Sequence, residues 1–396
     1  MSSSQTTYHS PFRSVLLREW QRMTSRRLYF GVCIVLPLFT LFFMATIFGN
    51  GQMENIPIGI IDQDNTTTSR AIARNISAVP TFKVTKHYVN EAAARKAVQK
   101  KEIYGYLSIP PKFEQDAISG KNATLCYYYH YALLSVGGEL MAAFETSLAP
   151  VSLSPIVMEA VALGVEQEEI TTFLLPVQAN NHPIYNPSLD YSIYLSQPFF
   201  FVLFQVLILL FTVYAVGIEI KFRTANDWLA TAKGNMITAV FGKLLPYTLI
   251  FILIGWLGNY VMFGILHIPF QGSWWVMNLV TALFIIATQA LGLFLFSLFP
   301  AISLVISVVS MVGSLGATLS GVTFPVSNMY PIVQGASHLF PVRHFTEIMQ
   351  TMIYAGGGFI YFWPSVVILC IFPLLALLLL PHLKRAIESH KYENIK

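Results

Sequence analysis

The chain has 396 residues, of which 55% are hydrophobic and only 11% are charged, and its mean hydropathy is +0.58. Soluble domains carry about 25% charged residues, so this composition excludes an ordinary soluble enzyme. Lys and Arg number 24 against 20 for Asp and Glu, and the resulting net charge of +4 is too small to indicate a nucleic-acid-binding protein.

Six charge-free apolar stretches are long enough to cross a bilayer, which takes roughly 20 helical residues. They predict membrane spans over residues 28–48, 193–217, 244–264, 274–299, 301–324 and 362–381. The first stretch is too long for the hydrophobic part of a signal peptide, and we interpret it as a retained span. The fold class expected is a polytopic α-helical membrane protein with six transmembrane helices.

An amphipathic helix is predicted before the first span, within residues 1–27. Apolar residues recur there at helical spacing, with basic side chains between them. The apolar residues are Phe12, Val15, Leu16, Trp20 and Met23. This pattern is typical of a helix that lies at a membrane interface. Anchoring on anionic lipid and docking of a partner protein explain the pattern equally well.

Residues 49–192 form a large insert between the first two spans. Residues 50–190 carry 10 basic and 14 acidic residues, which favours a position outside the membrane. Strand-like runs alternate with helical runs, with strands at 56–61, 103–109 and 124–131 and helices at 69–77, 91–99, 135–148 and 156–173. This alternation predicts an extracytoplasmic α/β domain. Asp62 and Asp64 resemble the start of a calcium loop, but no Glu follows at the required spacing, so no metal site is expected.

Lys and Arg are concentrated in three segments at the ends of spans, which are residues 1–27, 218–243 and the tail 382–396. The positive-inside rule places these segments, and therefore both termini, in the cytoplasm. Residues 218–243 also mix charged with aromatic side chains. We expect a short helix there that is presented to another protein.

Residues 325–361 contain apolar pieces too short to cross the membrane, interrupted by Pro325, Pro331 and Pro341 and by the glycines at 356–358. Broken helices at membrane depth need protein or water to satisfy their backbone, so a re-entrant outer segment is predicted. Arg343, His344 and Glu347 then lie near the outer surface, either as a local ion pair or as a contact for substrate or lipid head groups.

The six predicted spans contain no Asp, Glu, Lys, Arg or His in their apolar interior. Ion-coupled carriers usually need such groups at membrane depth, because the ion must be bound and released there. The sequence also lacks the phosphate-binding G-x-x-x-x-G-K-[ST] loop. We therefore expect a transport subunit that is not itself an enzyme and that receives its energy from a cytoplasmic partner.

Several segments, taken in order, resemble the ABC type-2 exporter permeases that carry a large extracytoplasmic domain. The resemblance lies in Arg18-Glu19-Trp20 through Leu36-Pro37-Leu38, residues 56–76, residues 104–125 with Ile109, Pro110 and Phe113, Tyr185-Asn186-Pro187, and residues 324–349. One departure follows the second span, where Arg223-Thr224 stands in place of the usual Gly-Thr.

The resemblance implies a permease in the bacterial inner membrane that pairs with a second copy or a paralogue. Separate ABC ATPase subunits would bind ATP and Mg, and this chain would hold no cofactor of its own. Membrane lipid is a further partner, a periplasmic adaptor is optional, and no nucleic acid is expected. The second and fifth spans of each half would line the substrate path.

Candidate site residues fall into three sets. ATPase coupling is expected at Arg18, Glu19, Trp20, Arg22, Glu219, Lys221, Arg223 and Asp227. The substrate path is expected to include Gln197, Phe201, Phe204, Gln205, Tyr214 and Gln289, whose uncharged and aromatic character suits a hydrophobic drug, a lipid-like molecule or an envelope molecule, although phenylalanines in a span also commonly face lipid. The outer re-entrant set is Pro325, Pro341, Arg343 and Glu347.

Two other functions fit the same chain. A receptor would bind a ligand through the outer domain, and a stoichiometric kinase or regulator would then accompany it. An ion-coupled secondary transporter would move its substrate in an ion gradient without ATP.

Overall fold

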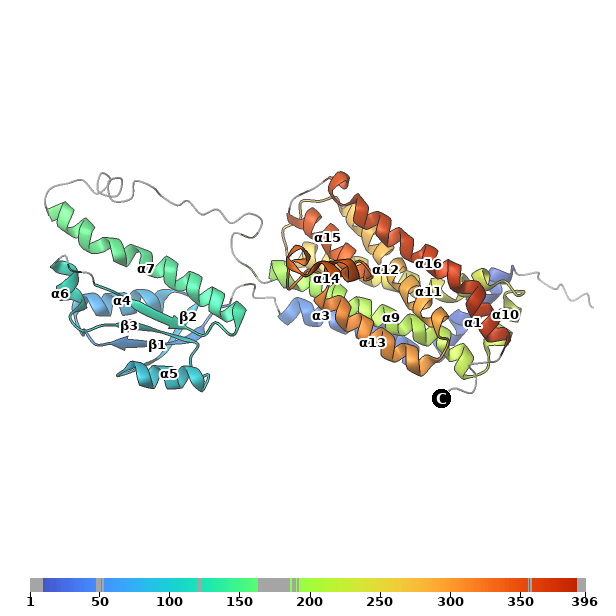
Figure 1. Cartoon of the computed structure of the whole chain (residues 1–396), viewed down its shortest axis with the longest axis horizontal. Coiled ribbons are helices and arrows are strands. Elements are labelled where there is room, and N and C mark those ends of the chain that lie inside the picture. The colour runs from blue at the N-terminus through green and yellow to red at the C-terminus, as the bar shows by residue number, and fades with distance from the viewer. Residues whose placement is uncertain are drawn as a thin grey trace, which may run out of the picture. The chain divides into compact units, whose positions relative to one another are not determined.

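The computed structural model describes residues 10–47, 51, 53–119, 121, 123–162, 186, 190, 192–354, 356 and 358–389, with the backbone alone at 150–162 and 354. Two compact units make up the chain (Figure 1), one formed by Met1–Gly51 with Asp190–Lys396 and the other by Gln52–Leu189. Parts of the sequence predictions lie outside the described residues, namely residues 1–9, 163–173, Tyr185, Pro187, Gly357 and 390–396.

The first unit is a helical bundle. Its elements are α1 (Pro11–Ser25), α2 (Arg27–Phe30), η1 (Gly31–Val35), α3 (Leu36–Ile47), η2 (Ser192–Ser196), α9 (Gln197–Lys221), α10 (Ala225–Thr231), α11 (Met236–Asn259), η3 (Tyr260–Ile265), α12 (Trp274–Leu298), α13 (Ile302–Thr318), η4 (Val326–Asn328), α14 (Pro331–Ser337), α15 (Pro341–Tyr354), η5 (Phe359–Tyr361) and α16 (Trp363–Glu388). The segments η1, η2 and η3 are π-helical and continue into α-helices, so they lengthen the helices that they join.

Five helical stretches of the described chain are long and apolar enough to cross a membrane, and they are Arg27–Ile47, Ser192–Lys221, Met236–Ile265, Trp274–Leu298 and Trp363–Glu388. Each overlaps a predicted span, so the chain has the architecture of a polytopic membrane protein. The predicted span 301–324 contains α13, a shorter apolar helix of 17 residues. Six crossings therefore stay a prediction.

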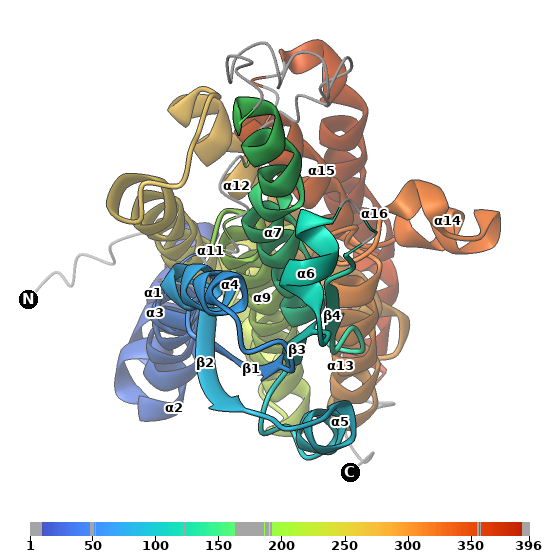
Figure 2. The ribbon, with the colours of Figure 1, turned by 90° about the vertical axis from the view of Figure 1, so that its left-hand side faces the viewer.

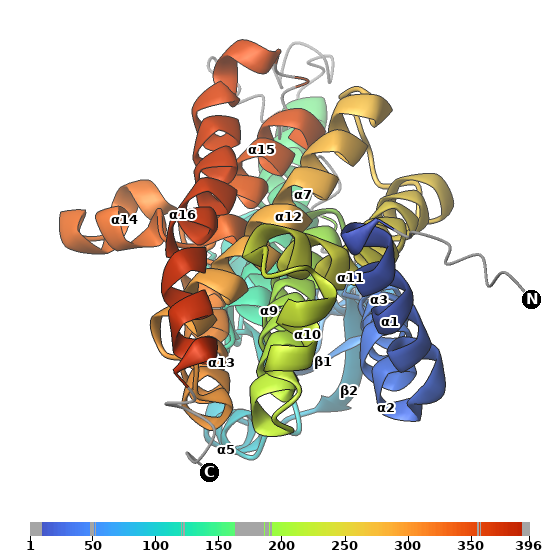
Figure 3. The same cartoon turned by 90° about the vertical axis from the view of Figure 1, so that its right-hand side faces the viewer.

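Aromatic side chains fill the centre of the bundle, where α12 packs against α9, α11, α15 and α16. Phe201, Phe284 and Phe345 join α9, α12 and α15, with ring centroids 4.5 Å apart for Phe345 and each of the other two. The re-entrant segment contributes α15, whose inner face is buried, whereas α14 projects outward beyond α16 (Figures 2 and 3). The broken segment therefore divides into a packed helix and an exposed one.

The second unit is an α/β layer structure. It contains β1 (Ile56–Asp62), α4 (Thr67–Ala78), β2 (Phe82–His87), α5 (Glu91–Gln99), β3 (Gly105–Ile109), α6 (Phe113–Ile118), β4 (Cys126–Tyr129) and α7 (Leu134–Ala162). The strand order is β2-β1-β3-β4, with β1 parallel to both neighbours and β4 antiparallel to β3. Helices α4 and α7 cover one face and α5 covers the other (Figure 1).

Two elements of this unit were not predicted from the sequence. The strand β2 has Phe82 buried and Val84 half-buried and otherwise carries exposed Lys, Thr and His, because it lies at the edge of the sheet. The short helix α6 begins at Phe113, directly after a left-handed Lys112. The sequence predicts two separate helices, at 135–148 and 156–173. This is wrong over the described residues, because a single helix, α7, runs unbroken from Leu134 to Ala162.

A methyl group at Gly105 should destabilise the second unit. A Cβ atom there would lie 2.8 Å from the carbonyl oxygen of Tyr128 in β4, and Gly105 itself lies in β3, which is hydrogen-bonded to β1 on one side and to β4 on the other. We expect Gly105→Ala to lower the free energy of unfolding by about 1–3 kcal/mol. Gly138→Ala is the matched control, because nothing lies within 4 Å of that position. Protease digestion of the full chain in denaturant measures both, and equal resistance of the two variants would contradict the expectation.

Candidate functional site

The helix α1 buries a carboxylate in the middle of its inner face. Its buried residues are Val15, Glu19 and Met23, which recur at a spacing of four and so lie along one stripe. The sequence pattern had placed Trp20 on the apolar face, but that side chain is 53% exposed. Glu19 takes the inward position because Lys243 and Tyr247 of α11, with Arg22 of α1 itself, are partners for its charge.

A glycine allows α1 to approach α11 closely. A Cβ atom at Gly242 would lie 3.0 Å from Cβ of Val15 and 3.3 Å from the carbonyl oxygen of Phe12. The two helices therefore cross at this point with almost no space between their backbones. Lys243 follows directly and is carried into the same contact, where its side chain is fully buried.

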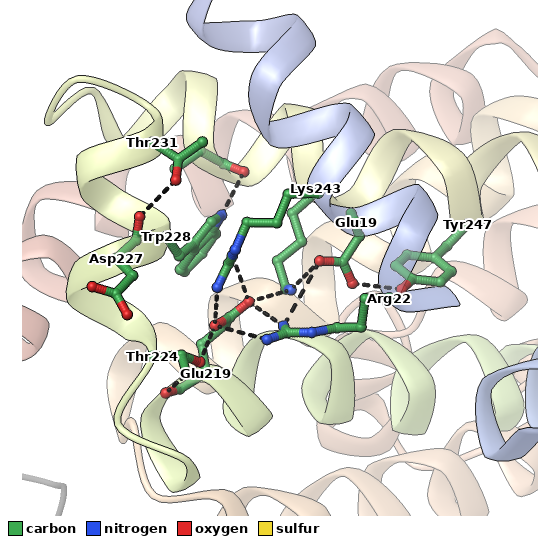
Figure 4. A network of polar contacts seen from close by, with 11 residues as sticks. Glu19, Arg22, Glu219, Thr224, Asp227, Trp228, Thr231, Lys243 and Tyr247 are labelled. Atoms are coloured by element: carbon green, nitrogen blue, oxygen red, sulfur yellow. Dashed lines mark hydrogen bonds and ion pairs between the residues drawn. The ribbon is translucent and has the colours of Figure 1, made fainter. Parts of the chain in front are cut away.

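Glu219, in the last turns of α9, binds cations from two other helices. Arg18 donates through Nη1 to Oε1 and through Nη2 to Oε2, each at 3.0 Å, which is a bidentate pair. Lys243 Nζ lies 2.8 Å from Oε1, and Arg22 also pairs with this carboxylate. The Thr224 hydroxyl donates to Oε2, so both oxygens of Glu219 are fully used (Figure 4).

Glu19 shares two of these cations. Lys243 Nζ lies 2.6 Å from its Oε2, and Nη1 of Arg22 lies 3.8 Å from the same oxygen. The Tyr247 hydroxyl donates to Oε1 at 2.5 Å. Figure 4 shows Lys243 between the two carboxylates, so a single ammonium group connects Glu19 with Glu219.

We call Arg18, Glu19, Arg22, Glu219 and Lys243 the buried charge network. Both carboxylates and the lysine are at most 1% exposed. Burial works against the charge of Arg22, but Glu219 and Glu19 raise the pKa of its guanidinium above the ordinary value. Three cations against two carboxylates leave one positive charge, and each charge has partners that offset its loss of hydration.

The indole of Trp228 attaches α10 to this network. Its Nε1 donates to the carbonyl oxygen of Ala239 in α11 at 3.1 Å, and Lys243 Nζ lies 5.5 Å from the ring centroid. The segment α1, the end of α9, α10 and the start of α11 are thereby joined into one body. The arrangement offers no nucleophile or general base, and within the described residues no group of His, Cys, Asp and Glu could hold a metal ion.

Comparison with known proteins identifies the family. Residues 27–380 match the family described as ABC-2 family transporter protein, which is most of the chain. The chain belongs to the ABC-2 transporter family. With its long apolar helices, it is a multi-pass transmembrane ABC transporter permease.

Individual relatives of this ABC-2 permease match over short stretches. A stretch of 105 residues, 26% of the chain, is 30% identical to the Inner membrane transport permease YhhJ of Escherichia coli K12 and covers 27% of that protein. A stretch of 119 residues, 29% of the chain, is 25% identical to the E. coli K12 protein named Probable multidrug ABC transporter permease YbhS and covers 31% of it. The matches thus span less than a third of either relative.

The residues predicted to couple this ABC-2 permease to an ATPase form two groups. Arg18, Glu19, Arg22 and Glu219 meet in the buried charge network, whereas Trp20, Lys221, Arg223 and Asp227 are exposed. Sequence reasoning missed the contributions of Lys243, Tyr247, Thr224 and Trp228. The position of Lys243 at the very edge of a charge-free stretch was the available signal. The predicted loop 218–243 is correspondingly shorter, because α9 extends to Lys221 and α11 begins at Met236.

The predicted substrate-path residues of the permease lie inside the bundle rather than on its surface. Gln197, Phe201, Phe204 and Gln205 are completely buried on α9. Gln205 Oε1 accepts from the backbone N–H of Val342 at 2.8 Å and so holds the start of α15. The Tyr214 ring packs 5.7 Å from Tyr29, and Gln289 lies apart from the α9 residues, on α12 beside Thr248.

Three of the four predicted outer residues, Pro325, Arg343 and Glu347, line a pocket of about 390 Å3. Pro325 lines it just before η4, and Pro341 begins α15. Arg343 and Glu347 line the same pocket and form an ion pair at 2.7 Å. Burial works to raise the pKa of Glu347, but the Ser365 hydroxyl and the Arg343 guanidinium hold it below its usual value. The alternative of a local ion pair is thus the one that the side chains adopt.

Proposed function

We propose that this permease is the membrane subunit of an ABC exporter in the bacterial cytoplasmic membrane. It moves an uncharged hydrophobic or amphiphilic molecule out of the cytoplasm or the inner leaflet. A separate ATPase subunit binds ATP and Mg, and a second permease copy or a paralogue completes the transporter. The family match supports the assignment to ABC transport, and the multidrug description of the relative YbhS supports the class of cargo.

The orientation proposed puts α1, α10 and both termini in the cytoplasm. The basic residues of α1, Lys384 and Arg385 near the end of α16, and Lys221, Arg223 and Lys233 around α10 lie on or beside elements that contact one another at one end of the spans. Cytoplasmic segments of membrane proteins carry this excess of Lys and Arg. A cytoplasmic ATPase would then meet the exposed group of Trp20, Lys221, Arg223 and Asp227.

The buried charge network is the observation that carries the mechanism. Because ion pairs link α1, α9 and α11, and Trp228 joins α10 to α11, a push on the exposed α10 region moves these segments together. Helix α9 then transmits the displacement along its whole length, from Lys221 to Gln197. Two such bodies rocking in a pair of permeases would give alternating access.

The buried side chains of α9 support the proposal that the cargo is uncharged. Gln197 is completely buried, and neither polar atom of its side-chain amide has a hydrogen-bond partner within the described residues. A buried amide without partners is costly unless another state of the protein or a ligand satisfies it. We propose that Gln197 and the neighbouring aromatic residues meet cargo when the helices separate.

Isolation of the chain from native membranes should yield a stoichiometric nucleotide-binding protein. Proteoliposomes holding both proteins should then concentrate Nile red, an uncharged fluorescent amphiphile, only when ATP and Mg are supplied, and fluorescence measures the uptake. The matched control is the permease alone in the same liposomes, which should give no accumulation. Uphill uptake by the permease alone in an imposed ion gradient would instead establish a secondary transporter.

A further inference from the structure

A cavity of about 210 Å3 lies between α11, α12 and α16, and Gln289, one of the residues predicted for the substrate path, lines it. Its lining includes Leu244 and Thr248 from α11, Gln289 and Leu293 from α12, and Pro373 and Leu377 from α16. Phe241 and Ile286 also line it and are 53% and 40% exposed, so its mouth opens on the side of the bundle. A molecule dissolved in the surrounding hydrocarbon can reach it directly.

The polar side chains that line the cavity are Thr248 and Gln289. The Thr248 hydroxyl lies 2.7 Å from Oε1 of Gln289 and 2.9 Å from the carbonyl oxygen of Leu244. Gln289 is 4% exposed, and its Nε2 has no hydrogen-bond partner within the described residues. The cavity therefore contains one unsatisfied hydrogen-bond donor in an otherwise apolar wall.

An unsatisfied donor of this kind selects a ligand by its chemistry. A buried amide N–H without an acceptor costs about 1–3 kcal/mol, which a ligand carrying a suitable oxygen would recover. The lining residues include no Asp, Glu, Lys or Arg, so a charged group would lose its hydration there without compensation. Cavities of 150 Å3 with apolar walls hold a benzene ring, and this cavity is larger.

We propose that this cavity is a binding site for a small uncharged molecule with an aromatic or branched apolar body and one carbonyl oxygen. The apolar body fills the space between α11 and α16, and the carbonyl accepts a hydrogen bond from Gln289 Nε2. The position of Gln289 within α12, about 13 Å of helix before its end at Leu298, places the site inside the hydrocarbon layer. The ligand therefore arrives from the bilayer. Gln289 also belongs to the predicted substrate path, but the binding measured below does not require ATP-driven transport.

Benzophenone tests the proposal directly, because it has the required body and carbonyl and inserts into nearby C–H bonds when illuminated. Mass spectrometry of the labelled full-length protein should locate adducts on α11, α12 and α16 around the cavity. Acetophenone should compete for this labelling about tenfold better than α-methylstyrene at equal membrane concentration, since the latter has the same shape without the oxygen.

Two variants separate the hydrogen bond from the cavity. Gln289→Leu should abolish the difference between the two competitors, whereas Thr288→Val should preserve it. Thr288 is the matched control because it is the adjacent buried residue, also has an unpartnered polar atom, and does not line the cavity. Adducts confined to other parts of the chain, or equal competition by both compounds in the unmodified protein, would overturn the proposal even if Gln289→Leu fails to fold.

Discussion

Replacement of Lys243 by methionine is expected to lower the free energy of unfolding by about 3–5 kcal/mol, because it leaves buried carboxylates without their shared cation. Glu19 loses its ion pair at 2.6 Å and keeps only Tyr247 and the more distant Arg22. Glu219 loses a contact at 2.8 Å but retains its two arginines. Unfolding of the detergent-solubilised protein in increasing denaturant measures the loss.

Lys384→Met supplies the matched control for this substitution. Lys384 also pairs with a glutamate, Glu388, but the pair is exposed and 3.8 Å long, so its loss should cost less than about 1 kcal/mol. A rescue variant sharpens the test, since Lys243→Met combined with Glu19→Gln restores the original net charge of the network. The double variant should be more stable than Lys243→Met alone. Equal stability of the two lysine variants would show that the network contributes nothing.

The distribution of charge along the sequence predicted where the spans lie, but it did not predict which charged side chains are buried. Hydropathy ends a predicted span at its first charged residue. The sequence therefore placed Glu219 and Lys243 in the loop between two spans. Both lie instead within long helices and are fully buried, because charges from three separate segments neutralise each other there. Pairing between residues more than two hundred positions apart, such as Arg18 and Glu219, leaves no local sequence pattern.

Sequence periodicity also failed to predict which face of α1 is buried and where the edge strand β2 lies. The stripe on α1 contains Glu19 rather than Trp20, because hydropathy cannot recognise a carboxylate that is buried with partners. The strand β2 was missed because an edge strand needs few apolar side chains. Strands β1 and β3 were predicted correctly, since central strands buried on both faces read as continuous apolar runs.

The sequence predicted eight coupling residues, but it did not predict which of them are buried and which are exposed. Four of the eight expected coupling residues meet in ion pairs between helices, and of these Glu19 and Glu219 are buried whereas Arg18 and Arg22 are partly exposed. The remaining four are exposed and are the ones that could touch an ATPase. A single sequence does not report burial, so it could not separate the residues of the ion-pair network from the exposed ones.

Reversal of both charges at Arg223 and Asp227 is therefore expected to uncouple the permease from its ATPase while leaving the permease folded. Both side chains are exposed beside α10, and Arg223→Glu with Asp227→Arg keeps the net charge unchanged. Like charges brought together at an interface cost several kcal/mol, so permease-stimulated ATP hydrolysis should fall by about tenfold or more. Phosphate release from the reconstituted complex measures the stimulation, and the unfolding midpoint in denaturant should match that of the unmodified protein.

A second charge-neutral reversal distinguishes coupling from a general electrostatic effect. Lys100 and Glu102 form an exposed ion pair in the α/β unit, so Lys100→Glu with Glu102→Lys makes the same exchange far along the sequence from α10. Stimulation should be unaffected in this control. If the Arg223 and Asp227 variant stimulates ATP hydrolysis as well as the control does, the exposed group around α10 does not receive the ATPase. The rigid body joined by the buried charge network would then have to be driven through α1 alone, where Trp20 is the exposed residue to test next.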